Sequence, residues 1–376
     1  MQMKIMSVVG ARPNFMKIAP FCRALAKHPE VTHILVHTGQ HYDVRMSDSF
    51  FVDLGIPEPD VHLNIGSGSH AEQVGRTMIE FEKVVRAEKP DWIVVVGDVN
   101  ATCACSIVAK KEHVKLAHIE AGLRSGDMDM PEEINRLVTD RLADLLLTPD
   151  RISNENLRAE GVPESRIAFV GNIMIDTLEA QRDKAAARNV TELVERELLE
   201  SRALPELPDN GFAVMTMHRP SNVDHIDILK PVVDFLTDEV ASDMPLLWPI
   251  HPRARKQLEE FGLWNKVRER IILLNPLGYH DMLRLNMGAK LMLTDSGGLQ
   301  EECCVLGTPC LTLRWNTERP VTLREHGGAS MLVGNDVGKI RAAYREVLGS
   351  PRLPQRPELW DGHTAERIVD VLLARA

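Results

Sequence analysis

Charged and imidazole side chains follow several of the short apolar runs in this chain. Asp98 follows IVVVG, and Glu120 follows LAHI. His218 follows FAVMTM and His251 follows LLWPI, where the second either touches a ligand or orients its loop. One such residue is ordinarily a helix cap or a turn former, and Asp98 fits that explanation. Repetition after successive runs instead indicates a site for acid–base chemistry.

The segment Thr294–Glu302, TDSGGLQEE, has the features of a nucleotide diphosphate site. Gly297 and Gly298 let the backbone approach a ligand closely, and the helix start supplies free N–H groups and a positive dipole end. Ser296 adds a hydroxyl donor, and Glu302 is placed to accept from ribose hydroxyls. A strand–turn–helix joint that needs glycine only for its geometry explains the segment equally well.

The segment MPEEINRLVTDRLADLL predicts a helix that begins at Pro131. Glu132 and Arg136 project from one face of this helix, opposite its apolar stripe. An exposed i,i+4 ion pair is favoured on spacing alone, whereas a chemical role requires this face to line a ligand site. The predicted apolar stripe consists of Ile134, Leu137, Val138, Leu142 and Leu145.

Short apolar runs that alternate with helical patterns must position these residues. Such alternation predicts parallel sheets with helices on both faces, and ligands at the carboxyl ends of the strands. Glu179 to Asn210 is predicted to be a surface helix with a proline-marked joint, and HTAERIVDVLLARA a final amphipathic helix. The predicted strands are Lys4–Val9, Ile34–Thr38, Trp92–Val96, Leu116–Ile119, Leu145–Thr148 and Ile167–Val170, then Phe212–Met217, Leu246–Ile250, Ile271–Leu274, Leu291–Thr294, Cys310–Leu313 and Ser330–Val333.

Length and composition restrict the class of protein. A chain of 376 residues suggests two domains, and 44% hydrophobic with 26% charged residues is typical of a globular protein. The net charge of −10 argues against a nucleic-acid or acidic-membrane partner. The amino terminus runs directly into a strand without a signal peptide, and no apolar run is long enough to span a membrane. These features predict a cytoplasmic protein.

The six cysteines include no CxxC pair, and most have apolar neighbours. This pattern predicts reduced, buried thiols rather than a metal site.

The ordered set of motifs resembles the non-hydrolysing UDP-N-acetylglucosamine 2-epimerases. This resemblance implies two Rossmann-like doubly wound α/β domains facing across a cleft, the glycosyltransferase-B architecture. The first domain would consist of residues 1–170 and 362–376, and the second of residues 171–361. The last helix would therefore cross back onto the first domain. The matching segments are GARPNFMKIAP, GDVNATCACS, HIEAGLRSGD, PEEINR, GNIMIDTL, the His218-Arg219 turn, TDSGGLQEE and NTERP.

The family's reaction inverts C2 of UDP-GlcNAc to give UDP-ManNAc, without a cofactor or a metal. UDP leaves together with the C2 proton, a 2-acetamidoglucal forms, and UDP then adds back after reprotonation on the other face. Carboxylates stabilise the positive charge that develops on the sugar ring, and acid–base groups move the proton. Basic side chains and a helix amino terminus hold the leaving diphosphate.

The resemblance also assigns roles to individual residues. Asp98, Glu120 and Glu132 match the catalytic carboxylates, Arg136 an arginine near them, and His218 the histidine that contacts the diphosphate. The uracil pocket would be backbone near Leu277, with Met282 covering the base. The positions that match UDP-binding residues are Arg12, Lys17, Ser296, Gly297, Gly298, Glu302 and Arg319.

The family's regulatory UDP-GlcNAc site resembles QHxxM followed by a later arginine. Gln40, His41 and Arg76 match it, but Tyr42–Val44 replaces the usual continuation. This departure predicts weak or absent activation by UDP-GlcNAc. HRPSNVD and Val321 also depart from the common pattern, which leaves room for a related sugar such as a UDP-2,3-diacetamido uronate.

Other functions stay open on the sequence alone. A glycosyltransferase of the same architecture would also bind a sugar acceptor, and a hydrolysing epimerase would release free ManNAc. A non-catalytic nucleotide-sugar sensor would have no need of Asp98, Glu120 and Glu132. A homodimer is implied by the resemblance only.

Overall fold

The computed structural model describes residues 3–10, 12–39 and 54–375, with only the backbone of Arg12 and Pro13. The chain forms two compact units: unit 1 is Met1–Ala180 with Pro357–Ala376, and unit 2 is Gln181–Arg356. The boundary between them lies inside helix α7 (Ile173–Ala186), whereas the sequence placed the domain boundary before this helix.

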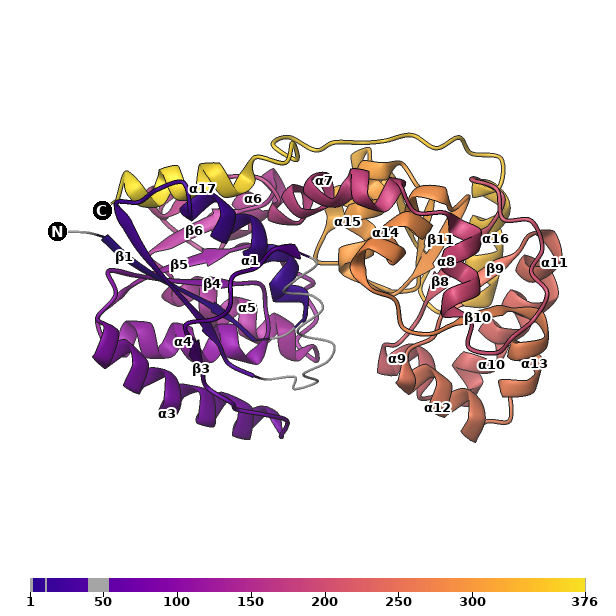
Figure 1. Cartoon of the computed structure of the whole chain (residues 1–376), viewed down its shortest axis with the longest axis horizontal. Coiled ribbons are helices and arrows are strands. Elements are labelled where there is room, and N and C mark those ends of the chain that lie inside the picture. Colours follow the sequence, from indigo (N-terminus) through magenta and orange to yellow (C-terminus); the bar gives the residue numbers. More distant parts are fainter. Residues whose placement is uncertain (1–2, 11, 40–53, 376) are drawn as a thin grey trace. The chain divides into compact units, whose positions relative to one another are not determined.

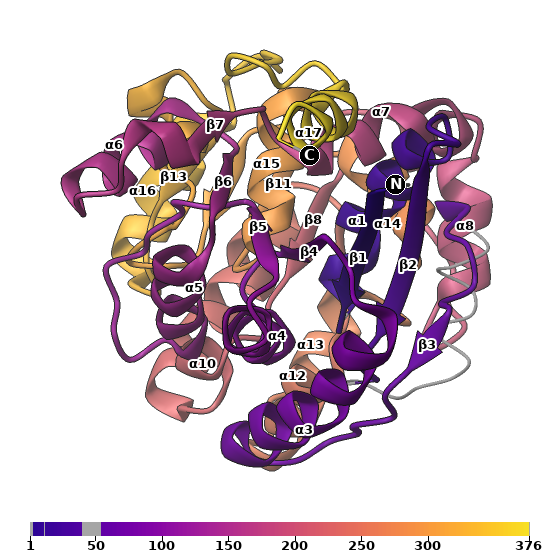
Figure 2. The ribbon, with the colours of Figure 1, turned by 90° about the vertical axis from the view of Figure 1, so that its left-hand side faces the viewer.

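Unit 1 contains a seven-stranded parallel sheet in the order β3-β2-β1-β4-β5-β6-β7 (Figure 2). The predicted strands are present, because each is an apolar run between turn residues. The edge strand β3 was missed, since two residues carry no periodic signal. The strands are β1 (Met3–Val9), β2 (Val31–His37), β3 (Val61–His62), β4 (Trp92–Val96), β5 (Lys115–Ile119), β6 (Leu145–Thr148) and β7 (Ile167–Phe169).

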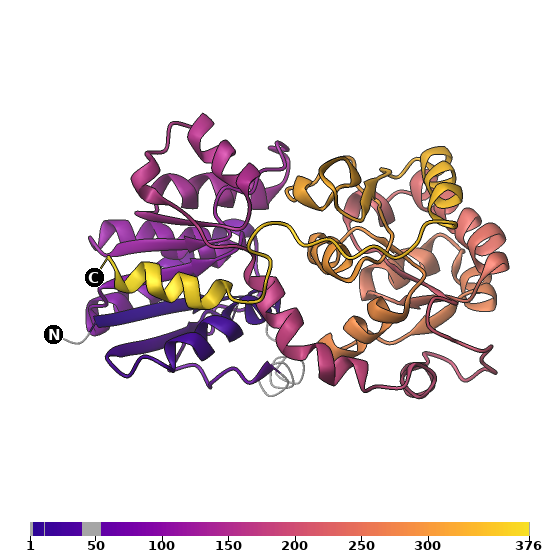
Figure 3. The ribbon, with the colours of Figure 1, turned by 90° about the horizontal axis from the view of Figure 1, so that it is seen from above.

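Helices cover both faces of this sheet. One core joins β1, β2, β4, β5 and β6 to apolar residues of α3, α4 and α6, among them Phe81, Val108 and Leu157. On the other side α17 packs along α1, so the last helix belongs to unit 1 (Figures 1 and 3). The helices of unit 1 are α1 (Arg12–Leu25), α3 (His70–Glu88), α4 (Asn100–Lys111), α5 (Pro131–Leu142), α6 (Arg151–Ala159), a 3-10 turn (Glu164–Arg166), α7 and α17 (Thr364–Leu373).

Unit 2 contains a six-stranded parallel sheet in the order β10-β9-β8-β11-β12-β13. The side chains alternate between two cores: Met215 and Trp248 contribute to one, and Val214 and Leu247 to the other. Successive side chains of a strand point to opposite faces of the sheet, and here both faces are covered by a core, as a doubly wound fold requires. The strands are β8 (Ala213–Thr216), β9 (Leu246–Pro249), β10 (Ile272–Leu274), β11 (Leu291–Thr294), β12 (Cys310–Thr312) and β13 (Ser330–Leu332).

The helices of unit 2 divide between these two cores. Helices α10, α12, α13 and α16 supply one core, and α8, α14 and α15 supply the other. The helices are α8 (Val190–Glu197), α9 (Pro220–Val223), α10 (Ile226–Phe235), a π-helix (Leu236–Val240), α11 (Ala241–Asp243), α12 (Pro252–Glu260), α13 (Trp264–Arg270), α14 (Tyr279–Gly288), α15 (Gly297–Leu306), α16 (Val337–Val347) and 3-10 turns at Pro320–Thr322 and Arg324–His326.

The segment between the predicted domains departs from the expected single surface helix. It contains the end of α7 and a separate α8, whose amino terminus is capped by the side chain of Asn189. Val190, Leu193 and Val194 of α8 are buried in the core of unit 2. Charged residues separate these three apolar residues in the sequence, so the buried face of α8 was not predicted.

Two predictions from composition can be compared with the structure. All six cysteines are free and buried, as predicted. Among the helices of the described ranges, none is both long enough and apolar enough to cross a membrane.

Candidate active site

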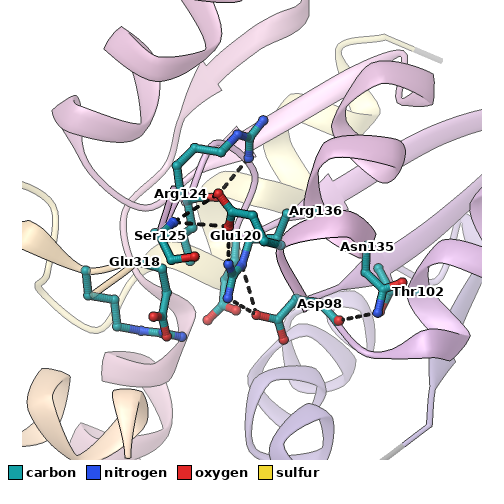
Figure 4. Close-up of polar contacts among 12 residues, drawn as sticks. Asp98, Thr102, Glu120, Arg124, Ser125, Asn135, Arg136 and Glu318 are labelled. Atoms are coloured by element: carbon teal, nitrogen blue, oxygen red, sulfur yellow. Dashed lines mark hydrogen bonds and ion pairs between the residues drawn. The ribbon is translucent and has the colours of Figure 1, made fainter. Parts of the chain in front are cut away.

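The turn after β4 presents Asp98 at the carboxyl edge of the sheet in unit 1. Its carboxylate accepts two hydrogen bonds from Arg136, from Nε at 3.0 Å and from Nη2 at 2.7 Å (Figure 4). Asn135 donates to the backbone carbonyl of Asp98 at 2.9 Å. Both donors reach the same oxygen, Oδ2, so helix α5 holds the side chain of Asp98 through this oxygen and the backbone of the turn through Asn135.

The most deeply buried face of α5 is polar. Of the predicted apolar stripe, Ile134 is exposed, whereas Leu137, Val138 and Leu142 are partly buried and Leu145 is buried. Glu133 and Arg136 are buried and form an ion pair, whereas Ile134 is 46% exposed. Glu133 also accepts from the backbone N–H groups of Ser125 and Gly126, at 2.9–3.1 Å. Helix α5 packs mainly against α4, and Glu133 accepts from the turn at Ser125 and Gly126. Hydrogen-bonded polar side chains therefore lie deeper than the apolar residues that set the periodicity.

Glu132 is exposed in the first turn of α5. The carboxylates that the structure pairs with Arg136 are Asp98 and Glu133, not Glu132. The sequence does carry one signal for this pair, because Glu133 is a second acidic residue at the start of a helix that also contains an arginine one turn later.

Glu120, at the end of β5, forms a buried ion pair with Lys17 of α1. The backbone of Glu120 is left-handed, with φ of 71°. Left-handed backbone is uncommon for a residue with a side chain, and such strain gathers at functional sites. Gly97 lies opposite at φ of 68°, where an added Cβ would stand 3.1 Å from Lys17 Nζ. Glycine at 97 thus lets the Lys17–Glu120 pair approach the turn that carries Asp98.

A buried histidine supports the turns of Asp98 and Glu120 and was not predicted. His118 of β5 has Nε2 at 2.8 Å from the carbonyl oxygen of Gly97 and Nδ1 at 2.6 Å from Asp140 of α5. Asp140 also accepts from the Gly122 backbone and from Arg124. Burial opposes ionisation of Asp140, but His118, Arg124 and this backbone N–H hold its pKa below the ordinary value. The sequence signal for this role is that His118 is a polar residue inside an otherwise apolar run.

In unit 2, His218 follows β8, and its imidazole faces the buried carboxylate of Asp295, which follows β11. His251 lies beside it, with 5.4 Å between the ring centroids. The Nδ1 atom of His251 accepts from the backbone N–H of Arg253 at 3.1 Å, so His251 caps α12 and orients its loop.

The start of α15 keeps its ligand-binding features. Ser296 occupies the N-cap position, but its hydroxyl makes no capping hydrogen bond. An added Cβ at Gly298 would meet nothing within 4 Å, whereas one at Gly297 would lie 2.7 Å from both Arg319 Nη1 and Glu318 Oε1. A Cβ at Gly297 would displace the ends of the Arg319 and Glu318 side chains, whereas Gly298 leaves the helix start open.

Arg319 is buried and paired with two carboxylates, at 2.8 Å to Glu301 and in closer contact with Glu318. Both partners belong to unit 2. The UDP contact expected for this arginine stays a prediction; within unit 2 its guanidinium pairs with Glu301 of α15 and with Glu318.

Glu302 lies one turn inside α15, buried near Tyr279 and Asn286. Burial raises the pKa of Glu302 to about 7, although hydrogen bonding with these two neighbours opposes the shift. Glu302, Tyr279 and Asn286 thus form a buried polar cluster beside α15.

The remaining predicted residues are placed as follows. Leu277 is buried and Met282 is partly buried against the same core of unit 2. Arg76 is exposed on α3 and pairs with Glu72 at 3.2 Å. The side chain of Arg12, together with Gln40 and His41, lies outside the described residues.

Comparison with known proteins decides the family. The model of the family described as UDP-N-acetylglucosamine 2-epimerase matches residues 23–373. The UDP-N-acetylglucosamine 2-epimerase of Methanocaldococcus jannaschii is 42% identical over 98% of this chain and 99% of that protein. The chain belongs to the UDP-N-acetylglucosamine 2-epimerase family. This membership confirms the resemblance drawn from the motifs and the predicted enzyme class, an isomerase.

Two further relatives bear on fold and substrate. A crystal structure of the M. jannaschii enzyme in complex with UDP-GlcNAc and UDP has a TM-score of 0.88 and 40% identity, covering 99% of this chain and 100% of that one. This likeness confirms two parallel-sheet α/β domains of the glycosyltransferase-B type. The UDP-2,3-diacetamido-2,3-dideoxy-D-glucuronate 2-epimerase of Pseudomonas aeruginosa is 37% identical over 98% of this chain and 99% of that protein.

Proposed function

We propose that this protein interconverts UDP-GlcNAc and UDP-ManNAc by elimination and re-addition of UDP. The observation that carries the proposal is the pairing of carboxylates and cations in unit 1, where Asp98 meets Arg136 and Glu120 meets Lys17. Sugar epimerisation of this type needs carboxylates held in fixed positions, and these pairs hold two of them.

Unit 1 supplies the groups for the sugar chemistry in this proposal. A base removes the C2 proton, the C1–O bond breaks with its electron pair leaving on UDP, and a C1–C2 double bond forms. Protonation of C2 on the other face and attack of UDP on C1 complete the inversion, so no electrons are gained or lost overall. Asp98, Glu120 and the exposed Glu132 are the candidate acid–base and charge-stabilising groups.

Unit 2 supplies the groups for the nucleotide. The open helix start at Ser296 and Gly298 would bind the diphosphate. Glu302, with Tyr279 and Asn286, would bind the ribose hydroxyls, and the segment near Leu277 and Met282 the base. UDP binding alone should therefore depend on unit 2 residues.

Solvent exchange tests the reaction. Incubation with UDP-GlcNAc in D2O should place deuterium at C2 of both epimers, because the abstracted proton can exchange before reprotonation. Asp98→Asn and Glu120→Gln should each lower kcat about 10²–10⁴-fold while UDP affinity by calorimetry changes little. NMR follows both the sugar and the label. Product without solvent deuterium at C2 would refute the elimination mechanism.

The preferred sugar is tested by comparing two substrates. The P. aeruginosa relative is named for a diacetamido glucuronate, whereas the M. jannaschii relative is named for UDP-GlcNAc. Because the M. jannaschii relative has the higher sequence identity, we propose UDP-GlcNAc as the preferred substrate. A higher kcat/KM for the diacetamido uronate would overturn this choice, and free ManNAc as product would indicate a hydrolysing enzyme.

The family resemblance further leads us to propose a homodimer in the cytoplasm. Light scattering coupled to size-exclusion chromatography measures the assembly, and a monomer at micromolar concentration would contradict it. Fractionation of cells followed by detection of the protein tests the location.

A further inference from the structure

Asp295 connects two strand ends of unit 2. It follows β11 and is fully buried. Its Oδ2 atom accepts hydrogen bonds from the backbone N–H groups of His218 and Arg219, at 2.9 and 2.8 Å, and from Asn222 Nδ2 at 3.1 Å. The carboxylate thus holds the turn between β8 and α9, and this turn carries His218.

The other carboxylate oxygen of Asp295 faces the His218 ring. Oδ1 lies 2.8 Å from His218 Nδ1, an ion-pair distance without the alignment of a full hydrogen bond. Hydrogen bonds in catalytic sites are often poorly aligned before a ligand binds. The short distance therefore still shows that Nδ1, rather than Nε2, is the ring nitrogen that faces the carboxylate.

The protonation of this pair follows from its surroundings. Burial opposes ionisation of Asp295, but the His218 ring and the backbone N–H groups of Arg219 and His218 hold its pKa below the ordinary value. A carboxylate can only accept hydrogen bonds, so Nδ1 of His218 must carry a proton. Nε2 is then the atom through which the ring, 43% exposed, can act on a ligand.

We propose that Asp295 is a positioning residue that keeps the proton of His218 on Nδ1, so that Nε2 faces the departing diphosphate. This inference rests on the proposed function, in which His218 contacts that diphosphate. When Nε2 is protonated as well, it donates a hydrogen bond to a diphosphate oxygen as the C1–O bond breaks. The His251 ring lies 5.4 Å from the His218 ring, and Arg219 donates from Nε to the backbone carbonyl of Asp295, so both are titratable or charged neighbours of the pair.

A purely structural role for Asp295, holding the turn, is the competing explanation. The substitution Asp295→Asn separates the two. The amide oxygen in the place of Oδ2 would keep all three donors, from His218, Arg219 and Asn222, so the turn is retained. The amide NH₂ in the place of Oδ1 would donate to Nδ1 of His218, which must then accept, and the ring proton moves to Nε2. The variant therefore preserves the turn and reverses the tautomer.

The first measurement is the tautomer itself, by ¹⁵N NMR of the His218 ring at a pH where it is neutral. We expect Nδ1–H in the wild type and Nε2–H in Asp295→Asn. Retention of Nδ1–H in the variant would overturn the proposal. This readout needs no turnover, so it stands even if the protein does not epimerise UDP-GlcNAc, and the two failures can be told apart.

The second measurement is kinetic. We expect Asp295→Asn to lower kcat about 10²–10⁴-fold, because the amide, unlike the carboxylate, cannot balance the positive charge of the ring when both of its nitrogens are protonated, with UDP affinity changed less than about threefold. Adding Asp295→Asn to His218→Gln should cause little further loss, because the carboxylate acts through that ring. Losses that multiply in the double variant would show that Asp295 acts independently of His218.

A matched control is Asn222→Ala, which loosens the same turn without touching the Oδ1–Nδ1 contact. It removes the hydrogen bonds to Asp295 and to the carbonyl oxygen of Leu313, the latter at 2.9 Å. It should lower the melting temperature more than Asp295→Asn does, while the Nδ1–H tautomer remains. A kcat loss in this control as large as that of Asp295→Asn, with the tautomer intact, would favour the structural role.

Discussion

Replacing His118 by phenylalanine tests whether this ring holds the turns that carry Asp98 and Glu120. Phenylalanine keeps an aromatic ring in the strand but removes both donors. The carbonyl oxygen of Gly97 and one oxygen of Asp140 would then lose their partner, in a fully buried position. Both are acceptors, so both ring nitrogens of His118 act as donors in the folded protein.

The expected cost follows from these two contacts. An unsatisfied buried carbonyl costs about 1–3 kcal/mol, and a hydrogen bond to a charged group contributes about 1.5–3 kcal/mol. Asp140 keeps Arg124 and the Gly122 backbone, which limits the second loss. We therefore expect His118→Phe to lower the free energy of unfolding by about 3–5 kcal/mol.

The assay is urea denaturation combined with hydrogen exchange of the β4 and β5 amides, since two units need not unfold together. The control is His33→Phe in strand β2 of the same sheet. His33 makes one hydrogen bond, to Ser7 at 2.7 Å, and burial lowers its pKa to about 4, so it is neutral. The control substitution should lower the free energy of unfolding by about 1 kcal/mol. If His118→Phe costs no more than His33→Phe, the double-donor reasoning is wrong.

Three further predictions concern the candidate site. Because the pKa of Glu302 is raised to about 7, its buried carboxylate weakens the folded state as the pH rises from about 4.5 towards 7. Glu302→Gln should therefore match the wild type at pH 5 and be about 3 kcal/mol more stable at pH 8, by thermal unfolding of the free protein; equal stability at both would contradict this. Gly297→Ala should lower the melting temperature, whereas Gly298→Ala should leave it unchanged and weaken UDP binding in calorimetry, because only the first Cβ meets protein atoms; the reverse pattern would refute the assignment of the open helix start. Glu132→Gln should lower kcat about 10²–10⁴-fold without affecting stability, and Glu133→Gln should lower the melting temperature because it removes a buried partner of an arginine; full activity of Glu132→Gln would mean that this residue is only a surface charge.

The strand framework could be predicted from the sequence because each strand is a short apolar run bounded by turn residues. The runs Trp92–Val96, Leu145–Thr148 and Leu291–Thr294 form strands with those bounds. Parallel strands end at one edge of their sheet, so the polar residues that follow them, such as Asp98 and Glu120, were correctly placed after strand ends. The family and its reaction class also followed from motifs in a fixed order along the chain.

The tertiary structure decided which charged groups are partners. Arg136 meets Asp98, and Asp140 meets His118, across more than twenty residues of sequence in each case. Periodicity detects an apolar face but carries no signal for a polar face that is buried by hydrogen bonds, so the burial of Glu133 and Arg136 on α5 was not predicted. The position of Asp295 against His218 is of the same kind. Such contacts depend on which strands become neighbours, and only the folded sheet determines that.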